Sequence, residues 1–328
     1  MKTISILALR NAVLASVADT RHVFVKVNEL LKQAGGKPLF RVQLVGATSE
    51  IELEDGLFSM RPDVLIEDVK KTDLVIIPSL TGDMMTATHL NREYAAWVAQ
   101  QYKNGAEVAA LCTGAFLLAF SGVLKNKECT THWAYANEFR YFYPLSLLVD
   151  EKLITDQNGV YTSGGNNAYW NLLIHLVEKY TDRNMAIRAA KYFVIDLNKN
   201  IQSPFIIFNG LKDHDDAVVL QVQEYIERNF LEKFTVDDLS LQFNTVRRTL
   251  ERRFRKATRN TIAEYIQRVK MEAAKKQLET GNKTVNEIML DVGYADIQAF
   301  RGLFKKLTGM TPVSYRDKYN PGNADPRK

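Results

Sequence analysis

"ALCTGAFLLAFSGVLKNKECTTHW", residues 110–133, joins an apolar run to a helical run through a Cys-Thr-Gly turn. Cys112 ends the apolar run, the helical run begins near Thr113, and His132 follows 20 residues after the cysteine. A cysteine at a helix N-terminus lies among free backbone N–H groups, which favour a thiolate and can hold an anion or a carbonyl. Cys112 is therefore a candidate pocket residue, with an inert core cysteine and a catalytic nucleophile as the other two interpretations.

Around this stretch, short β-rich runs alternate with amphipathic helical runs. The apolar runs include "TISILAL", "LFRVQLV", "DLVIIP" and "EVAALC". This alternation predicts an α/β domain over residues 1–198, with a doubly wound, mostly parallel sheet. Such sheets bind ligands at the carboxyl ends of their strands. Besides Cys112, neutral or aromatic residues are predicted to meet at that edge, namely Asn11, Thr81, Thr113, His132, Trp133, Asn166 and Asn167.

The composition limits the class of protein. A chain of 328 residues with 46% hydrophobic residues has enough material for two domains. Its two cysteines form no CxxC pair, so we expect neither a disulfide scaffold nor a metal site, and no cofactor. Because no apolar run reaches the roughly 20 residues of a membrane span, we expect a cytoplasmic protein that does not enter a membrane.

All of the excess positive charge lies in the last third of the chain. Residues 1–213 carry 22 basic and 22 acidic residues, whereas residues 214–328 carry 21 basic and 16 acidic residues. The segment "RRTLERRFRKATR", residues 247–259, is typical of a phosphate-facing surface or of a solvated helix face. A stretch interrupted by proline and glycine precedes this part, so we predict a linker at 199–213, a helical domain at 214–320 and a tail at 321–328.

The helical domain contains a repeat. "TVDDLSLQF" at Thr235 recurs as "TVNEIMLDV" at Thr284, and "TRNTIAEYIQR" at Thr258 recurs as "TGMTPVSYRDK" at Thr308. Threonine followed three residues later by Asp or Glu predicts a capped helix start. Each repeat predicts a short helix, a turn and a second helix, which is the arrangement of a helix-turn-helix.

The second helix of each repeat has one apolar and one basic face. Apolar pairs four residues apart, such as Leu250 with Phe254, predict the buried stripe. A generic helical bundle does not explain why the opposite faces of both helices are basic. The residues predicted to contact DNA are Arg247, Arg248, Glu251, Arg252 and Arg255 in the first helix, and Ile297, Gln298, Arg301 and Lys305 in the second.

The first domain resembles the PfpI/ThiJ group, which is related to the class I glutamine amidotransferases. The resemblance rests on "CTGAFLLA", "TTHW" and "VYTSGGNNAYWNLLIHLVEKY". Hydrolytic members of the group have a carboxylate after the first strand where this chain has Ser16, and glycines where it has Ser79 and Leu80. The resemblance therefore implies an effector pocket that includes Ser16 and is not an enzyme site, with a PfpI-type cysteine hydrolase or amidase as the alternative.

The second domain resembles the AraC/XylS-type transcription regulators. "DVGYADIQAFRGLFKKLTGMTPVSYR" matches their signature closely, although Val246 replaces the usual capping serine and Gly302 a commonly basic residue. The two resemblances together match the GlxA subfamily of regulators. They imply a regulator that binds double-stranded DNA, senses a small effector such as an amino acid or an amine, and forms a homodimer through its first domain.

Overall fold

The chain forms two compact units, Met1–Gln202 and Ser203–Lys328, in a computed structural model that describes residues 1–197, 201–212, 214–232 and 234–320. The predicted tail at 321–328 lies outside the described residues, as do 199, 200 and 213 of the predicted linker. The described rest of that linker is divided between the two units. The predicted domain limits at 198, 214 and 320 stay a prediction.

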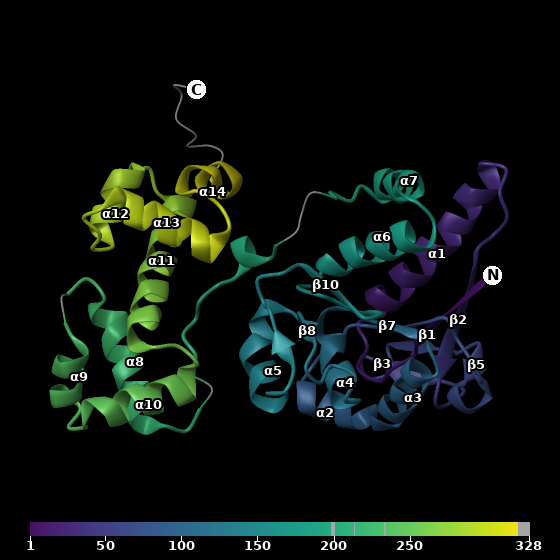
Figure 1. The fold of residues 1–328 in the computed structure, drawn as a ribbon, viewed down its shortest axis with the longest axis horizontal. Helices are drawn as coiled ribbons and strands as arrows, with labels where there is room; N and C mark the ends of the chain where they lie inside the picture. Colours follow the sequence, from purple (N-terminus) through teal and green to yellow (C-terminus); the bar gives the residue numbers. More distant parts are fainter. Residues whose placement is uncertain (198–200, 213, 233, 321–328) are drawn as a thin grey trace. The chain divides into compact units, whose positions relative to one another are not determined.

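The first unit is built on a seven-stranded sheet (Figure 1). Every neighbouring pair in it is parallel except the antiparallel pair at one edge. This confirms the predicted α/β class with its mostly parallel sheet. In spatial order the strands are β10 (Ile154–Gln157), β11 (Val160–Ser163), β7 (Glu107–Ala110), β6 (Leu74–Ile77), β1 (Lys2–Leu7), β2 (Phe40–Gly46) and β5 (Val64–Leu65).

Helices cover both faces of this sheet. Helices α1 (Leu14–Gln33), α6 (Ala168–Tyr180) and α7 (Arg183–Phe193) lie on one face (Figure 1). The central strands β1, β6 and β7 are largely buried on both sides, which explains why they read as apolar runs. On the other face lie α2 (Met84–Leu90), α3 (Arg92–Lys103), α4 (Ala115–Phe120) and α5 (Ala136–Phe142).

Short elements complete the first unit. Two small sheets pair β3 (Ile51–Leu53) with β4 (Phe58–Met60), and β8 (Glu128–Cys129) with β9 (Leu147–Leu148). Single turns of 3₁₀ helix lie at η1 (Ile66–Asp68), η2 (Cys112–Gly114) and η3 (Trp133–Tyr135).

The second unit is helical and has two separate cores. Its long helix α11 (Ile262–Thr280) places Tyr265 in one core and Met271 in the other, so a single rigid element links the two halves. After η4 (Ser203–Phe205), the remaining helices are α8 (Ala217–Asn229), α9 (Val236–Gln242), α10 (Arg247–Thr258), α12 (Val285–Asp291), α13 (Ile297–Thr308) and α14 (Pro312–Tyr319).

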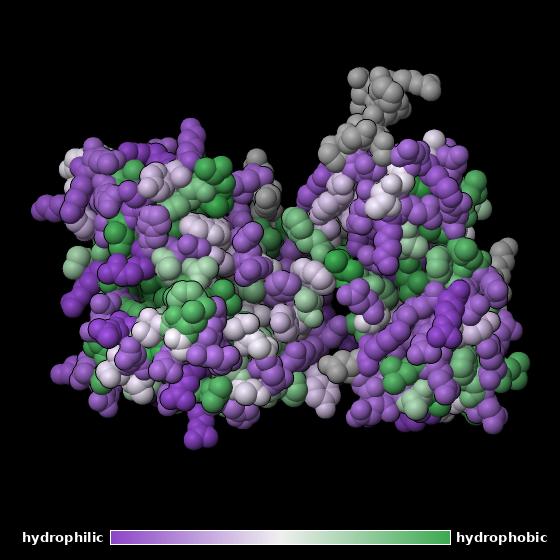
Figure 2. Space-filling model, turned by 180° about the vertical axis from the view of Figure 1, so that it is seen from behind, coloured by the Kyte–Doolittle hydropathy of each residue, from purple (hydrophilic) through white to green (hydrophobic). Residues whose placement is uncertain are grey.

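The predicted capping boxes are confirmed. Thr235, Thr261 and Thr284 each accept a hydrogen bond from the backbone N–H three residues on, and the acidic side chain there accepts from the threonine N–H. Hydrophilic residues cover most of the visible face of each unit (Figure 2). Among the described residues, no helix is long and apolar enough to cross a membrane, and no cluster of His, Cys, Asp and Glu could hold a metal ion.

Candidate functional site

Cys112 lies on a strained turn between β7 and η2. Its φ of 53° is in the left-handed region, which costs a non-glycine residue about 1–3 kcal/mol. The turn is held on both sides, because the Cys112 N–H donates to Ser163 Oγ (3.0 Å) and the Thr131 hydroxyl donates to the Cys112 carbonyl (3.0 Å). A Cβ at Gly114 would lie 2.5 Å from the Pro78 carbonyl oxygen, so only glycine fits there. The backbone is therefore that of a nucleophile elbow.

The side chain of Cys112 is buried, and its thiol is hard to ionise. It is 3% exposed, and burial raises the pKa of its thiol to about 11 against the opposing effect of hydrogen-bonding groups on Thr113 and Ser79. At neutral pH the group is a thiol and not a thiolate, which is the reactive form. From its place at a helix N-terminus we expected a thiolate, but burial of the thiol raises its pKa instead.

Ser16 is buried on α1 and stabilises the loops near the elbow. Its hydroxyl donates to the Val13 carbonyl (2.7 Å) and accepts from the Ser79 N–H (3.1 Å). One turn further along α1, Asp19 accepts a hydrogen bond from the Tyr169 hydroxyl (2.6 Å). The sequence reasoning overlooked Asp19, although a carboxylate three residues from Ser16 on a helix shares its face. Asp19 therefore contacts a tyrosine on α6.

His132 is half-buried and uncharged at neutral pH. Burial lowers its pKa, and its Nδ1 accepts a hydrogen bond from the Ala134 N–H (3.1 Å). The proton of the neutral ring therefore lies on Nε2. The rings of Trp133 and Tyr135 lie 5.4 and 5.9 Å from the imidazole, so His132 has aromatic neighbours. A Cβ at Gly165 would lie 3.8 Å from Nε2, which places His132 beside the loop after β11.

The remaining predicted pocket residues fall into two groups. Asn11, with a φ of 59°, and Thr81 belong to paired loops, since the Thr81 N–H donates to the Asn11 carbonyl (2.8 Å). Thr113 joins these loops to the elbow through hydrogen bonds with both backbone groups of Leu80. Asn166 and Asn167 are exposed, and Asn167 precedes α6 without capping it. The structure thus connects Cys112, Thr113, Ser16, Asn11 and Thr81 through shared loops.

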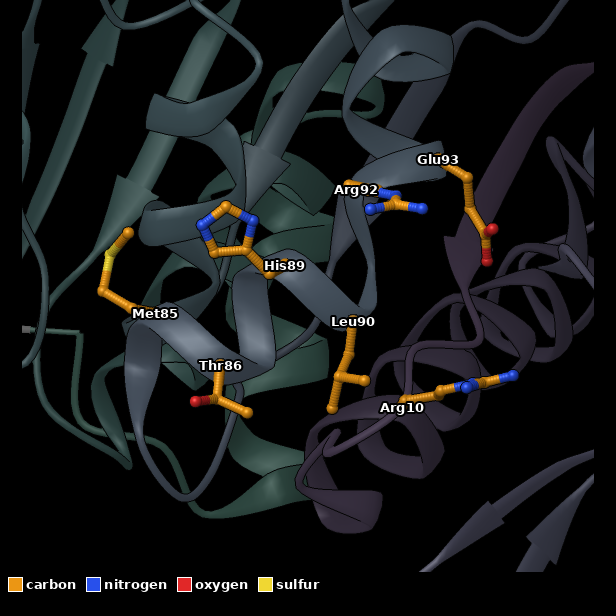
Figure 3. Close-up of a pocket in the computed structure, with 7 residues that line it drawn as sticks. All are labelled: Arg10, Met85, Thr86, His89, Leu90, Arg92 and Glu93. Carbon is orange, nitrogen blue, oxygen red and sulfur yellow. The ribbon is translucent and has the colours of Figure 1, made fainter.

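A cavity of about 590 Å³ lies beside this group, and none of the predicted pocket residues lines it. Figure 3 shows Arg10, Arg92 and Glu93 extending toward one side of it, with Met85, Thr86 and His89 at the other. Buried Asn91 fixes the Arg10 backbone through two hydrogen bonds. These charged residues are exposed and resemble ordinary surface residues in the sequence, which explains why sequence reasoning overlooked them.

The second unit contains two helix-turn-helix motifs with the same construction. In the first, α9 and α10 are joined by a turn at Asn244 (φ 45°), and in the second α12 and α13 are joined at Gly293 (φ 77°). Residues 251–260 and 301–310 have the same order of buried, half-buried and exposed positions. The repeat in the sequence is therefore a repeat in the structure.

The predicted DNA-facing residues are not equally available. Arg248, Arg252 and Arg255 are exposed on α10, as are Gln298, Arg301 and Lys305 on α13. Arg247 instead donates to Asp237 (2.8 Å) and Glu251 (3.2 Å), which forms an ion-paired group on the surface. Ile297 is half-buried and packs against the core of its motif.

Arg253, which was not among the predicted contacts, is half-exposed and ion-paired. It donates two hydrogen bonds to Asp216, at 2.8 and 2.6 Å, and Asp216 also caps α8. The Arg253 guanidinium holds the pKa of the Asp216 carboxyl below its usual range. The spacing along α10 could have shown this, because Arg253 adjoins the buried Phe254 and lies three residues after buried Leu250.

Comparisons with known proteins agree with this architecture. Residues 21–179 match the DJ-1/PfpI family and residues 239–318 match a helix-turn-helix domain family. The HTH-type transcriptional regulator GbdR of Pseudomonas aeruginosa is 23% identical over 317 residues, which covers 96% of this chain and 84% of that protein. The HTH-type transcriptional regulator CdhR of the same organism is 22% identical over 279 residues, covering 85% and 82%.

Solved structures support the fold of the first unit. A candidate transcriptional regulator from Vibrio parahaemolyticus has a TM-score of 0.52 and 19% identity, over 58% of this chain and 98% of that one. A ThiJ/PfpI family protein from Pseudomonas syringae has a TM-score of 0.50 and 15% identity, over 69% and 86%. The chain thus joins a region that matches the DJ-1/PfpI family to a region that matches a helix-turn-helix domain family, and over most of its length it is similar to HTH-type transcriptional regulators.

Proposed function

We propose that this protein is a sequence-specific DNA-binding transcription regulator that responds to a small effector bound in its first unit. The observation that carries the DNA-binding part is the repeated helix-turn-helix, in which α10 and α13 expose basic side chains at matching positions. Basic residues on a recognition helix read base edges and bind phosphates in the major groove. That the chain's excess positive charge lies in this unit supports the proposal.

In vitro selection of duplex DNA on the full chain tests this function. We expect an enriched sequence, and Arg252→Ala should raise its Kd about fivefold or more, since one base-reading arginine contributes about 1–3 kcal/mol. Arg188→Ala, at an exposed position on α7 of the first unit, is the charge-matched control and should bind as wild type does. If Arg252→Ala matches wild type in affinity and in salt dependence, α10 does not read the DNA as proposed.

The footprint should be longer than one helical turn. Because α11 contributes to both cores, the two recognition helices belong to one unit and should enter consecutive major grooves about 34 Å apart. Protection of a single groove by the full chain would argue against paired insertion.

The effector site is proposed at the strand ends around Cys112 and His132. A buried thiol and an uncharged imidazole offer hydrogen bonds and shape without acid–base chemistry, which suits binding better than turnover. By analogy with the family resemblance, the effector is a small amino acid or amine. A thermal-shift screen of such metabolites should find a ligand that raises the Tm of the first unit, and Cys112→Trp should abolish that shift.

The left-handed backbone of Cys112 favours a second candidate, a cysteine hydrolase or amidase. Hydrolysis of chromogenic anilides and esters by the full chain tests it directly. Turnover that disappears in Cys112→Ala would establish that function and displace effector binding.

We further propose that the protein acts in the cytoplasm as a homodimer formed by its first unit. Light scattering of the purified chain tests the dimer.

A further inference from the structure

Gln202 is fixed inside the first unit although it is the last residue before the second. Its side chain is 1% exposed. The Gly165 N–H donates to its Oε1 (2.8 Å), while its Nε2 donates to Thr130 Oγ1 (3.2 Å) and to the Thr131 carbonyl (3.0 Å). Both ends of the amide therefore have partners, so the side chain is held in a single position.

These partners belong to the wall of the proposed effector site. Thr131, which accepts from Gln202 through its carbonyl, donates through its hydroxyl to the Cys112 carbonyl. Gly165, on the other side of the amide, lies next to the imidazole of His132. Thr131 thus hydrogen-bonds both Gln202 and Cys112. A ligand that displaces Thr131 or Gly165 must disturb the Gln202 amide.

Gly164 shows how closely the amide fits. A Cβ at Gly164 would lie 2.6 Å from both Cδ and Oε1 of Gln202, which is nearer than real side-chain contacts allow. Any other residue at this position must therefore displace Gln202. Displacement of Gln202 would leave the half-buried Gly165 N–H and the buried Thr131 carbonyl without this partner.

The residues that follow Gln202 are fixed in the second unit. The Tyr319 hydroxyl donates to the Pro204 carbonyl (3.1 Å), and Lys275 Nζ donates to the Ile206 carbonyl (2.6 Å). Lys275 is 5% exposed and also pairs with Glu272 (2.7 Å) on α11, the helix shared by both DNA-binding motifs. Glu272 in turn accepts from the Phe208 N–H (3.1 Å). Only Ser203 separates the last anchor in one unit from the first anchor in the other.

We propose that Gln202 is the positioning residue through which the strand-end site and the DNA-binding unit influence each other. Seating of its amide fixes where the chain leaves the first unit, and the short anchored segment passes that constraint to α11. The proposal rests on the proposed function, since it assigns the regulation of the same site. By thermodynamic linkage, binding at the strand-end site must change DNA affinity, and DNA binding must change the strand-end site.

This reciprocity allows a test without an identified effector. The full chain is treated with N-ethylmaleimide, with and without saturating duplex DNA enriched on it from a random library, and labelling of Cys112 is followed by peptide mass spectrometry. In the wild type we expect DNA to change the rate at Cys112 about fivefold or more. Labelling of Cys129, the other buried cysteine, is followed in parallel and should change less than that of Cys112.

Two variants disrupt the hydrogen bonds of the Gln202 amide, one at the amide itself and one at its neighbour Gly164. Gln202→Ala removes the amide, and Gly164→Ala expels it. Both should label Cys112 faster without DNA, lose the DNA-dependent change in rate, and still bind the duplex with an affinity that differs from wild type by no more than the coupling factor. Gln100→Ala, which removes an exposed amide on α3 that bonds Asn104, is the matched control and should behave as wild type does.

The possible failures are distinguishable. Absence of any bound duplex refutes the proposed DNA-binding function, and it appears in the binding measurement alone. An unchanged Cys112 rate in DNA-saturated wild type overturns the proposal about Gln202, as does a variant that retains the full DNA effect. Unaltered labelling of Gln202→Ala without DNA overturns it as well, because the amide would then not support the wall of the site.

Discussion

At the scale of a residue, Cys112 is a thiol whose protonated form the fold stabilises. Burial raises its pKa to about 11 from a reference value of 9.0. The unfolded thiol ionises first as the pH rises, so this contribution to stability is complete below pH 9 and is lost as the pH approaches 11. From pH 7.5 to pH 10.5, the free energy of unfolding of the wild type should fall by about 2 kcal/mol more than that of Cys112→Ser. Urea titrations under reducing conditions measure this difference.

The comparison isolates one group, because every other alkaline-titrating residue is shared by the two proteins. Parallel stability curves for wild type and Cys112→Ser over this range would mean that the thiol is not protected from ionisation. The thiol would then have the accessible, reactive character that a nucleophile requires.

Two glycines of the second recognition helix should respond in opposite directions to alanine. Gly302 lies within α13 with open space around its Cβ position, so Gly302→Ala should raise the free energy of unfolding by about 0.5–1 kcal/mol. Gly309 ends α13 at a φ of 71°, so Gly309→Ala should lower it by about 1 kcal/mol. Urea unfolding of the full chain followed by circular dichroism tests the pair. Equal shifts in one direction would contradict the conformational explanation.

At the scale of an element, the two recognition helices differ at the N-cap, the residue that directly precedes each helix. Asp296 caps α13 by accepting from the Gln298 and Ala299 N–H groups, whereas Val246 precedes α10 with no side-chain cap and is 71% exposed. We expect Val246→Ser to stabilise α10 by about 1 kcal/mol and Asp296→Ala to destabilise α13 by a similar amount. Hydrogen exchange at the first turn of each helix measures both effects. Unchanged protection in Val246→Ser would show that the helix start is fixed by packing alone.

The elements themselves could be predicted where local chemistry determines them. The threonine capping boxes marked three helix starts, and the turns at Asn244 and Gly293 adopt the left-handed backbone that their residue types favour. Apolar runs likewise marked β1, β6 and β7, because these central strands are largely buried on both faces. Such signals depend on neighbours in the sequence, so no tertiary information was needed.

The candidate site could be predicted only in part, because its partners come from distant segments. Nothing local in the chain indicates that Arg247 pairs with Asp237, or that Gln202 occupies the space beside Gly164. The burial that raises the pKa of Cys112 likewise depends on the packing of loops from several strands. A helix N-terminus suggested a thiolate, but desolvation dominates once the loops close over the sulfur.

At the scale of the whole molecule, charge is divided between a neutral first part and a basic second part. Residues 214–328 hold the net charge of +5, and α10 and α13 expose much of it. DNA affinity of the full chain should therefore fall steeply with salt, with a slope of about −0.9 in log–log form for each phosphate neutralised. In the repeat, the exposed Gly302 occupies the position that Arg252 occupies in the first motif.

Gly302→Lys tests whether the exposed face of α13 lies against the DNA phosphates, as we propose for the exposed face of α10. The open space at its Cβ accommodates a side chain, so the lysine should add one phosphate contact, tighten binding at low salt and steepen the slope by about 0.9. Gly302→Ala separates this effect from helix stabilisation, because it gains helix propensity without charge and should keep the wild-type slope. Titration of labelled duplex by fluorescence anisotropy between 50 and 300 mM salt measures all three slopes. Identical slopes for Gly302→Lys and Gly302→Ala would place this face of α13 away from the DNA, and the second motif would then not insert as the first does.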